Sequence, residues 1–187
     1  MAPPSGPAGR QPAGGKTGPP GEPTDHALGR SRGGFSTKVH LVTDGGGRPL
    51  AVLVTAGQVH ESRVLEAAIE AVRVRRAGRG RPRCRPAAVA GDKGYSHPRI
   101  RRYLAGRGIR AVIPRRADQR PHDGRVRLDR EQYRRRNVVE RCVNRLREYR
   151  RVGTRYEKLA GSYLAVVQVA CIREWLKTLT TGLSDTP

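Results

Sequence analysis

The chain has few of the residues that would indicate an exported or zinc-binding protein. Its three cysteines, Cys84, Cys142 and Cys171, lie far apart, are odd in number and form no CxxC pair. Neither a disulfide framework nor a zinc site is therefore predicted. No apolar run approaches the ~20 residues of a membrane span, and the amino terminus lacks the basic-then-apolar order of a signal peptide. We expect a reduced, cytoplasmic protein that is neither exported nor membrane-embedded.

Acidic residues are scarce relative to basic ones. The 187 residues include 38 lysines and arginines against 16 aspartates and glutamates, which gives a formal net charge of +22. Positions 97–155 hold 20 arginines, no lysine and 6 acids. Neutralising phosphates releases condensed counterions, and arginine's planar fork suits phosphate contacts. Nucleic acid is the expected partner, although a solvated surface in a high-arginine proteome would give a similar count.

The amino-acid composition of the amino-terminal third changes near residue 35. Residues 1–34 are mostly glycine, proline and small side chains, which cannot offset the entropy of ordering a backbone, so a disordered tail is predicted. Two runs rich in β-branched residues, 37–43 and 49–57, flank the turn-forming sequence DGGG at 44–47. This pattern predicts a β-hairpin.

A helix and a basic linker are expected next. Apolar residues from 64 to 72 recur at helical spacing, and Ser62 is placed to cap that helix. His60, just before it, is interpreted as a hydrogen-bonded loop histidine. The arginine-rich Gly/Pro segment 75–86 has no periodicity and is expected to cross the surface.

The middle of the chain has a strand, helix, strand pattern. The short apolar runs 87–90 and 109–113 enclose a helical stretch at 98–104. A parallel strand pair with its crossover helix is therefore predicted, and a polar, arginine-rich loop follows at 115–128.

Two helices are expected after that loop. Asp129 and Gln132 resemble a capping box that opens a long helix to about residue 151. Residues 162–179 form a more apolar helix with one hydrophobic face that includes Leu179. The sequence thus predicts an α/β fold.

Two of the acids stand in positions that suit metal chemistry. Asp92 follows the strand at 87–90 at its carboxyl end, where α/β sheets present ligands and catalytic groups. Gly91 and Gly94 would let a backbone or a phosphate approach closely. A surface-loop aspartate is the alternative interpretation.

Glu140 is the second acid, and it lies on the long helix. At 3.6 residues per turn, Tyr133, Arg136, Glu140 and Arg147 fall within about 60° of one another. A neighbouring apolar stripe would pack on the sheet and aim this polar stripe across it. A lattice of exposed salt bridges, worth a few tenths of a kcal/mol per pair, is the alternative.

The polar stripe also resembles a family signature. It reads Y-x2-R-x3-E-x6-R, which is similar to the Y-x2-R-x3-E-x6-K signature of bacterial insertion-sequence DDE transposases. GDKGYS around Asp92, GRSRGG at 29–34 and NVVERCVNRL around Glu140 resemble other blocks of that family, in the family's order. The likeness covers about residues 20–177.

The resemblance implies an RNase H-like mixed sheet flanked by helices. Two Asp and one Glu of such a core bind two divalent ions, usually Mg²⁺ and alternatively Mn²⁺, and Asp92 and Glu140 would be the second and third ligands and catalytic residues. The residues implied to contact DNA are Tyr133, Arg136, Asn144 and Arg147. The implied activity is metal-dependent strand cleavage and strand transfer at insertion-sequence ends by a homodimer associated with the nucleoid.

One element of the family's pattern is missing. The family's first aspartate lies on the first, central strand of the sheet, and no strand-borne Asp precedes Thr37. Asp25 and Asp44 are interpreted as turn residues. Without that strand, backbone groups of its neighbours lose their partners and the metals have too few ligands. Residues 35–180 are thus expected to form a partial catalytic domain, followed by a flexible terminus at 181–187.

Several functional interpretations stay open at this point. The chain is expected to be poorly active alone, either as the second half of a transposase encoded in two frames or as a decayed remnant. A remnant that only binds DNA predicts salt-sensitive binding without cleavage. An RNase H-like nuclease without strand transfer would give no joined products. No helix-turn-helix or zinc finger is evident, so specific recognition of element ends is expected to lie elsewhere.

Overall fold

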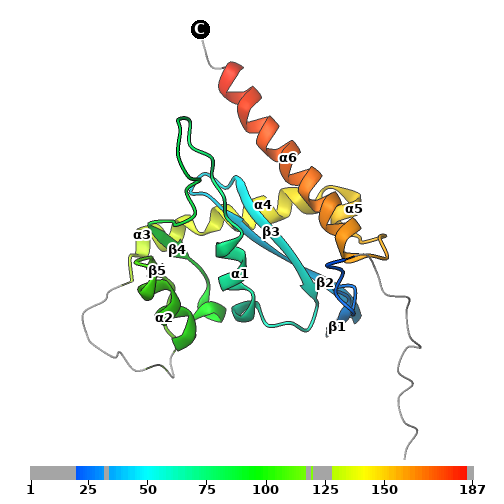
Figure 1. The fold of residues 1–187 in the computed structure, drawn as a ribbon, viewed down its shortest axis with the longest axis horizontal. Helices are drawn as coiled ribbons and strands as arrows, with labels where there is room; N and C mark the ends of the chain where they lie inside the picture. The colour runs from blue at the N-terminus through cyan, green and yellow to red at the C-terminus, as the bar shows by residue number, and fades with distance from the viewer. Residues whose placement is uncertain (1–19, 32–33, 117–118, 120–127, 185–187) are drawn as a thin grey trace, which may run out of the picture.

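The structure, a computed structural model, describes residues 20–31, 34–116, 119 and 128–184, with side chains to residue 179. Figure 1 shows β2 and β3 near the centre, β4 and β5 to the left beside α2, and α6 extending to the top. The strands are β1 (Gly29–Ser31), β2 (Gly34–Thr43), β3 (Pro49–Ala56), β4 (Ala88–Ala90) and β5 (Arg110–Val112). The helices are η1 (Glu61–Arg63), α1 (Leu65–Glu70), η2 (Lys93–Tyr95), α2 (Pro98–Gly106), α3 (Arg130–Arg135), α4 (Asn137–Arg147), α5 (Arg150–Gly153) and α6 (Ala160–Ser184).

The predicted hairpin is confirmed as β2 and β3. The two strands pair antiparallel, with Val39 opposite Val54 and Leu41 opposite Val52. The Asp44 carboxylate accepts hydrogen bonds from the N–H groups of Gly46 and Arg48, each at 2.9 Å, which closes the turn. The short strand β1 pairs with residues 34–36 of β2, giving a sheet of order β1-β2-β3.

The predicted parallel pair is also confirmed. β4 and β5 pair parallel to each other, and α2 is the helix between them in the chain. These two strands form a separate two-stranded sheet in the part of the chain that the structure describes. The mixed α/β class expected from the sequence therefore holds, and the strands are divided between two small sheets.

Part of the segment expected to be a tail is packed on the body of the molecule. The Glu22 carboxylate accepts hydrogen bonds from the N–H groups of Ala160 (2.6 Å) and Gly161 (3.0 Å), the first residues of α6. Ala27 is buried, and its carbonyl accepts from the Thr37 hydroxyl at 2.6 Å. The prediction of a tail over 1–34 therefore differs from the structure over 20–31, because partners distant in sequence hold this segment.

The cap predicted for the first helix is wrong. His60, not Ser62, occupies the capping position, and its ring Nδ1 accepts from the Ser62 N–H at 3.2 Å. The cap opens the short helix η1, and α1 follows at Val64 without a side-chain cap. The interpretation of His60 as a hydrogen-bonded loop histidine is confirmed.

The long helix predicted from Asp129 to about residue 151 is divided in three. Asp129 caps α3 as expected, accepting from the Gln132 N–H at 3.0 Å. The chain then tightens at Arg136, whose carbonyl accepts from the N–H three residues later. At Tyr149 the backbone becomes extended (φ −73°, ψ 112°) and ends α4 before α5.

Helix α6 matches the second predicted helix and extends beyond it at both ends. Val167 and Cys171 are buried as expected, whereas Leu179 is 57% exposed and does not join the core. The Trp175 indole N–H donates to the Pro49 carbonyl at 2.6 Å and so fixes α6 on the hairpin.

None of the helices in the described ranges is both long and apolar enough to cross a membrane.

A buried carboxylate joins α4 to α6. Glu174, 4% exposed, accepts hydrogen bonds from Arg145 Nε (2.8 Å), the Tyr149 hydroxyl (2.7 Å) and Lys177 Nζ (2.9 Å). Burial alone would raise the pKa of Glu174, but these donors outweigh it and lower the pKa to about 2. The network therefore stabilises the position of α4 while Glu174 is ionised.

Loss of this carboxylate should be visible as a pH-dependent change in stability. The folded pKa lies below the unfolded one, so the contribution is present above about pH 4.5 and is lost as the pH falls toward 2. Glu174→Gln should therefore lower the free energy of unfolding at neutral pH by about 2 kcal/mol. It should also flatten the acid limb of a denaturant-unfolding series. The exposed Glu148→Gln is the matched control, and equal behaviour of the two variants would contradict the prediction.

Candidate active site

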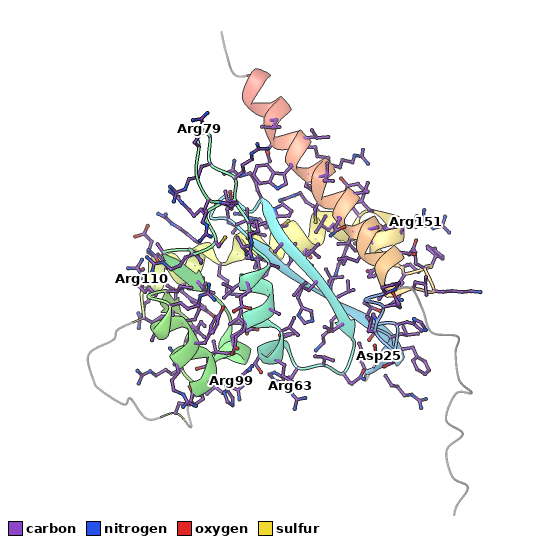
Figure 2. All side chains as sticks on the ribbon, in the orientation of Figure 1. Asp25, Arg63, Arg79, Arg99, Arg110 and Arg151 are labelled. Atoms are coloured by element: carbon purple, nitrogen blue, oxygen red, sulfur yellow. The ribbon has the colours of Figure 1, made fainter. Side chains whose placement is uncertain are left out.

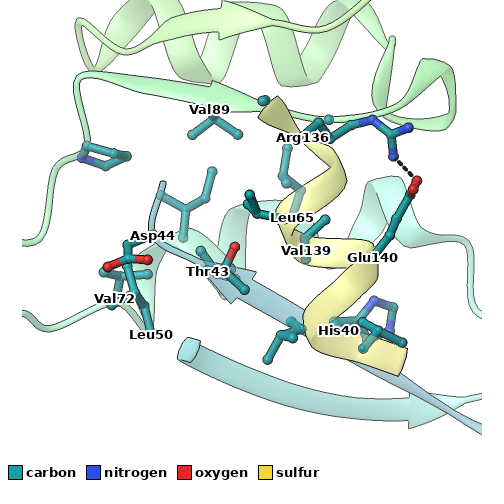
Figure 3. Close-up of a pocket in the computed structure, with 18 of the residues that line it drawn as sticks. His40, Thr43, Asp44, Leu50, Leu65, Val72, Val89, Arg136, Val139 and Glu140 are labelled. Carbon is teal, nitrogen blue, oxygen red and sulfur yellow. Dashed lines mark hydrogen bonds and ion pairs between the residues drawn. The ribbon is translucent and has the colours of Figure 1, made fainter. Parts of the chain in front are cut away.

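A large cavity separates two hydrophobic clusters. One cluster joins α4, α5 and α6 to the face of the hairpin that carries Val39 and Leu41. The other joins α2 and β5 to Leu65 and Ile69 of α1 and to Val89 of β4. Between them lies a cavity of about 1180 Å³. Figure 3 shows Val89 facing Thr43 and Leu65 across this space, with α4 along one side.

The cavity meets two strands at their edges. Every residue from 37 to 43, in β2, lines the cavity. The same holds for every residue from 88 to 92, which form β4 and the two positions after it. Because side chains alternate between the two faces of a strand, an uninterrupted run of lining residues indicates a strand edge and not a face. Among the described strands, β4 pairs with β5 alone, and residues 37–43 of β2 pair with β3 alone. Two strand edges therefore border the same empty space.

Asp92 lies at the carboxyl end of β4, as predicted. It caps η2, and its Oδ1 accepts from the Gly94 N–H at 2.8 Å. A β-carbon at Gly94 would stand 2.9 Å from that oxygen, and one at Gly91 would stand 3.1 Å from the Tyr95 ring. The two glycines thus make room for the chain's own carboxylate and ring, and the approach of a backbone or phosphate stays a prediction.

Glu140 lies on α4 and lines the same cavity as Asp92. Its carboxylate, 51% exposed, pairs with Arg136 Nη1 at 2.5 Å, the contact dashed in Figure 3. Arg136 Nε is buried and has no hydrogen-bond partner within the described residues. The Arg136 guanidinium also lies over the Tyr133 ring, 5.4 Å from its centroid.

The two carboxylates act on the same guanidinium. Burial would lower the pKa of Arg136, but the hydrogen bond and charge of Glu140 raise it, and Tyr133 and Asp92 add to that direction. Asp92 also acts on Tyr95, whose pKa rises to about 12 through burial first and then through the charges of Glu61 and Asp92. The structure thus brings Asp92 and Glu140 into one electrostatic environment around Arg136.

The other predicted DNA-contacting residues are placed differently from one another. Arg147, exposed at the last position of α4, lines the cavity. Tyr133 is half-buried beneath Arg136 and is not among the lining residues. Asn144 is exposed on α4, outside the lining, and its side chain forms no hydrogen bond within the part of the chain that the structure describes.

Two further acids line the cavity. The Asp44 carboxylate accepts hydrogen bonds from the hairpin turn and pairs with Arg48. Burial alone would raise the pKa of Asp44, but these contacts lower it. Glu61, in η1, contacts Lys38 at 3.7 Å and lies close to η2, which follows Asp92. The sequence analysis did not identify Glu61 as a residue that lines the cavity. The only sequence feature that pointed to it is its position directly after His60, which caps η1.

The carboxylates of this chain make an incomplete metal site. Asp92 and Glu140 offer the oxygen ligands that divalent cations prefer. Across the described ranges, no three His, Cys, Asp or Glu side chains converge to hold an ion. One oxygen of Asp92 already accepts from Gly94, and Glu140 is neutralised by Arg136. These residues alone therefore do not fit a two-ion site.

Comparison with known sequences gives this geometry a context. The family described as "Transposase DDE domain" matches residues 10–175. A Burkholderia cepacia protein assigned as a transposase for insertion sequence element IS402 is 37% identical over 157 residues, which cover 83% of this chain and 66% of that protein. A Brucella ovis protein assigned as a transposase for element IS6501 is 26% identical over 148 residues, covering 76% of this chain and 100% of that protein. No solved structure matches the chain.

The match includes every element that borders the cavity. It runs from before β1 to Trp175 on α6, and so contains Asp92 on the β4 side and Glu140 on α4. The chain spans just under two thirds of the length of the IS402 relative. From the extent of the family match, the chain belongs to the transposase DDE domain family.

Proposed function

We propose that this chain supplies two of the three catalytic carboxylates of an enzyme that cuts DNA at insertion-sequence ends and joins it to a target. The observation that carries the proposal is that Asp92 and Glu140, from different elements, line one cavity bordered by two strand edges. The third carboxylate would arrive on a strand that fills the cavity.

The strand edges support an RNase H-like arrangement. A strand inserted between β2 and β4 would bond to both edges and turn the two small sheets into one mixed sheet. The carboxyl ends of parallel strands meet at the same edge of a sheet, so an aspartate ending a strand parallel to β4 would lie beside Asp92. At about 1180 Å³, the cavity exceeds the roughly 300–1,000 Å³ usual for small-ligand clefts.

Members of this family generally use divalent metal ions, and we infer Mg²⁺, or alternatively Mn²⁺, for this enzyme. Asp92 and Glu140 would each hold the ions together with the third carboxylate. Such ions activate a water or a 3′-hydroxyl and stabilise the leaving oxygen at phosphorus. The chain's own residues must first change partners, because Arg136 neutralises Glu140 in the structure.

Arg136 is suited to such a change. Its free Nε donor, its fork geometry and its place over Tyr133 allow it to leave Glu140 and bind a DNA phosphate. Arg147 would bind the backbone at the far end of α4, and Asn144 beside it would do so from the exposed face. DNA is thus the proposed partner, and positioning of its phosphates is the proposed role of these residues.

We further infer that the active species is a homodimer on paired element ends. The described surface includes exposed apolar side chains on α6, among them Val169, Ile172 and Leu179, which a second copy would cover. Size measurement with and without DNA tests this point.

A catalytically inactive, DNA-binding remnant is the second candidate. The incomplete set of carboxylates and the Arg136–Glu140 pair favour it for the chain alone. Both candidates share DNA binding, so binding does not separate them.

The test compares the chain alone with the chain to which a strand ending in aspartate has been joined, called the completed enzyme. Labelled duplexes that carry the element end are incubated with Mg²⁺, and cleaved and joined products are resolved by size. We expect both products from the completed enzyme, none from the chain alone, and none after chelation of the metal. Cleavage without joining would identify a nuclease. If a folded, completed enzyme gives neither product, the second candidate, an inactive DNA-binding remnant, is the better account.

A further inference from the structure

The segment after α1 forms an exposed arm. We call residues 73–85 the arginine arm; its base is closed by reciprocal backbone hydrogen bonds between Val74 and Arg83, at 3.0 and 2.7 Å. The intervening residues turn back through Gly78 and Gly80, and Gly80 has φ +134°, which favours glycine. Figure 1 shows this loop projecting from the body, and Figure 2 places Arg79 at its far end. The expectation that 75–86 runs over the surface is confirmed by the exposure of residues 75–83.

The charge of the arginine arm is of one sign. No acid occurs between Glu70 and Asp92, and seven arginines lie in the arm. They are Arg73, Arg75, Arg76, Arg79, Arg81, Arg83 and Arg85, and all are exposed. No ion pair links any of them to an acid of the described residues. Holding these like charges together in an antiparallel pair is unfavourable without a polyanion.

Some arginines outside the arm form ion pairs with acids of the described residues. Arg99 contacts Glu66 at 3.2 Å, Arg107 contacts Glu70 at 3.1 Å, and Arg145 contacts Glu174 at 2.8 Å. Within the arm, Arg73 donates to the carbonyls of Glu70 and Val72, and Arg85 donates to that of Arg107. The side chains of the other five arginines donate no hydrogen bond to the described residues, so their donors are open to a partner outside the chain. For the arm itself a second copy is a poor partner, because the arm's arginines would face a chain of net charge +22. The apolar face of α6 proposed for the homodimer is a separate surface.

The base of the arginine arm borders the cavity at the amino end of β4, and Asp92 follows the carboxyl end of that strand. Val74, Arg83 and Arg85 line the same cavity as Asp92 and Glu140. A nucleic acid that is held at these carboxylates and is longer than the cavity would extend along it toward the arm.

We propose that the arginine arm binds the phosphate backbone of duplex DNA that flanks the candidate active site; this inference rests on the proposed function. The residues from 71 to 91 contain no aromatic side chain, so the arm lacks the stacking platform that single-stranded DNA uses. Guanidiniums spread along an extended loop match successive phosphates of a duplex and not one small anion. The contact is therefore independent of base sequence.

The experiment measures duplex binding over a salt series. The arm variant carries Arg75→Ala, Arg76→Ala, Arg79→Ala and Arg81→Ala, and the control variant carries Arg30→Ala, Arg63→Ala, Arg102→Ala and Arg110→Ala. The control removes equal charge at exposed positions that do not line the cavity. Both are compared with the unaltered chain on two unrelated duplexes of roughly 30 base pairs, about three helical turns. Unfolding curves confirm that each variant folds.

The slope of log K against log salt reports the number of phosphates neutralised. Each phosphate contributes about 0.9, so the arm variant should lose roughly 3 from the slope, equally on both duplexes. The control should lose less than about 1, and lysine at the four arm positions should restore most of the slope. Equal slopes for the arm and control variants would overturn the arm's role and leave the proposed function standing. If the unaltered chain does not bind DNA, the arm's role and the proposed function are both wrong. If the arm variant loses more of the slope on single strands than on duplexes in the same salt series, the assignment to duplex DNA is wrong.

Discussion

Replacing Glu140 by glutamine should abolish DNA cleavage and joining by the completed enzyme, with a rate loss on the order of 10³-fold or more. Glutamine keeps the size of the side chain but removes the charge that would hold a divalent ion. Half-exposed on α4, the side chain contributes little to the core, so folding should be unaffected. The variant also releases Arg136 from its ion pair, so DNA binding should be retained.

Glu148→Gln is the matched control for that measurement. Glu148 is exposed just beyond α4, does not line the cavity and forms no described ion pair. Cleavage and joining are measured with both variants at equal DNA occupancy, so that binding and chemistry are separated. A Glu140→Gln enzyme that transposes at the unaltered rate would exclude Glu140 from the catalytic site.

The second large effect is expected when a strand is supplied to the cavity. A seven-residue strand of valine and isoleucine ending in aspartate, joined to the chain through a Gly/Ser linker, should pair with the free edges of β2 and β4. Satisfying those edges and covering their apolar neighbours should add about 3 kcal/mol, which raises the melting temperature by roughly 10 °C. The same strand should confer metal-dependent cleavage on a chain that otherwise has none.

A proline at the centre of that strand provides the control. It keeps the composition nearly constant but removes a donor and cannot occupy the middle of a sheet. Thermal unfolding and amide exchange of residues 37–43 would report the difference. Equal melting temperatures for the two fusions would show that the strand does not insert between the edges.

The elements that the sequence predicted correctly depend on neighbours in the chain. The hairpin follows from β-branched runs around Asp44, and the β4, α2, β5 unit follows from apolar runs separated by glycine and proline. The place of Asp92 at the end of β4 was predicted in the same way, because the end of a strand is a local feature, while the catalytic roles of Asp92 and Glu140 stay predictions. Glu140 required the spacing of the polar stripe and the resemblance that the spacing carries.

The elements that differed from prediction depend on distant partners. The extended backbone at Tyr149 accompanies its hydroxyl contact with Glu174 on α6. Glu22 is ordered by the first N–H groups of α6, and no pattern near residue 22 indicates this contact. The division into two sheets could not be predicted from the sequence either. Local patterns indicate which residues form strands, but they do not indicate which strands pair with one another.

That division has a consequence for how the molecule responds to stress. The two hydrophobic clusters lie on opposite sides of the cavity, and α1 packs on β2 and β3 while it contributes Ile69 to the β5 side. We expect a molecule built in this way to have two units of local stability, with α1 in contact with both. Each unit can open without the other, so the unfilled chain exposes its interior to proteases more often than its global stability indicates, and occupation of the cavity would merge the units into one cooperative body.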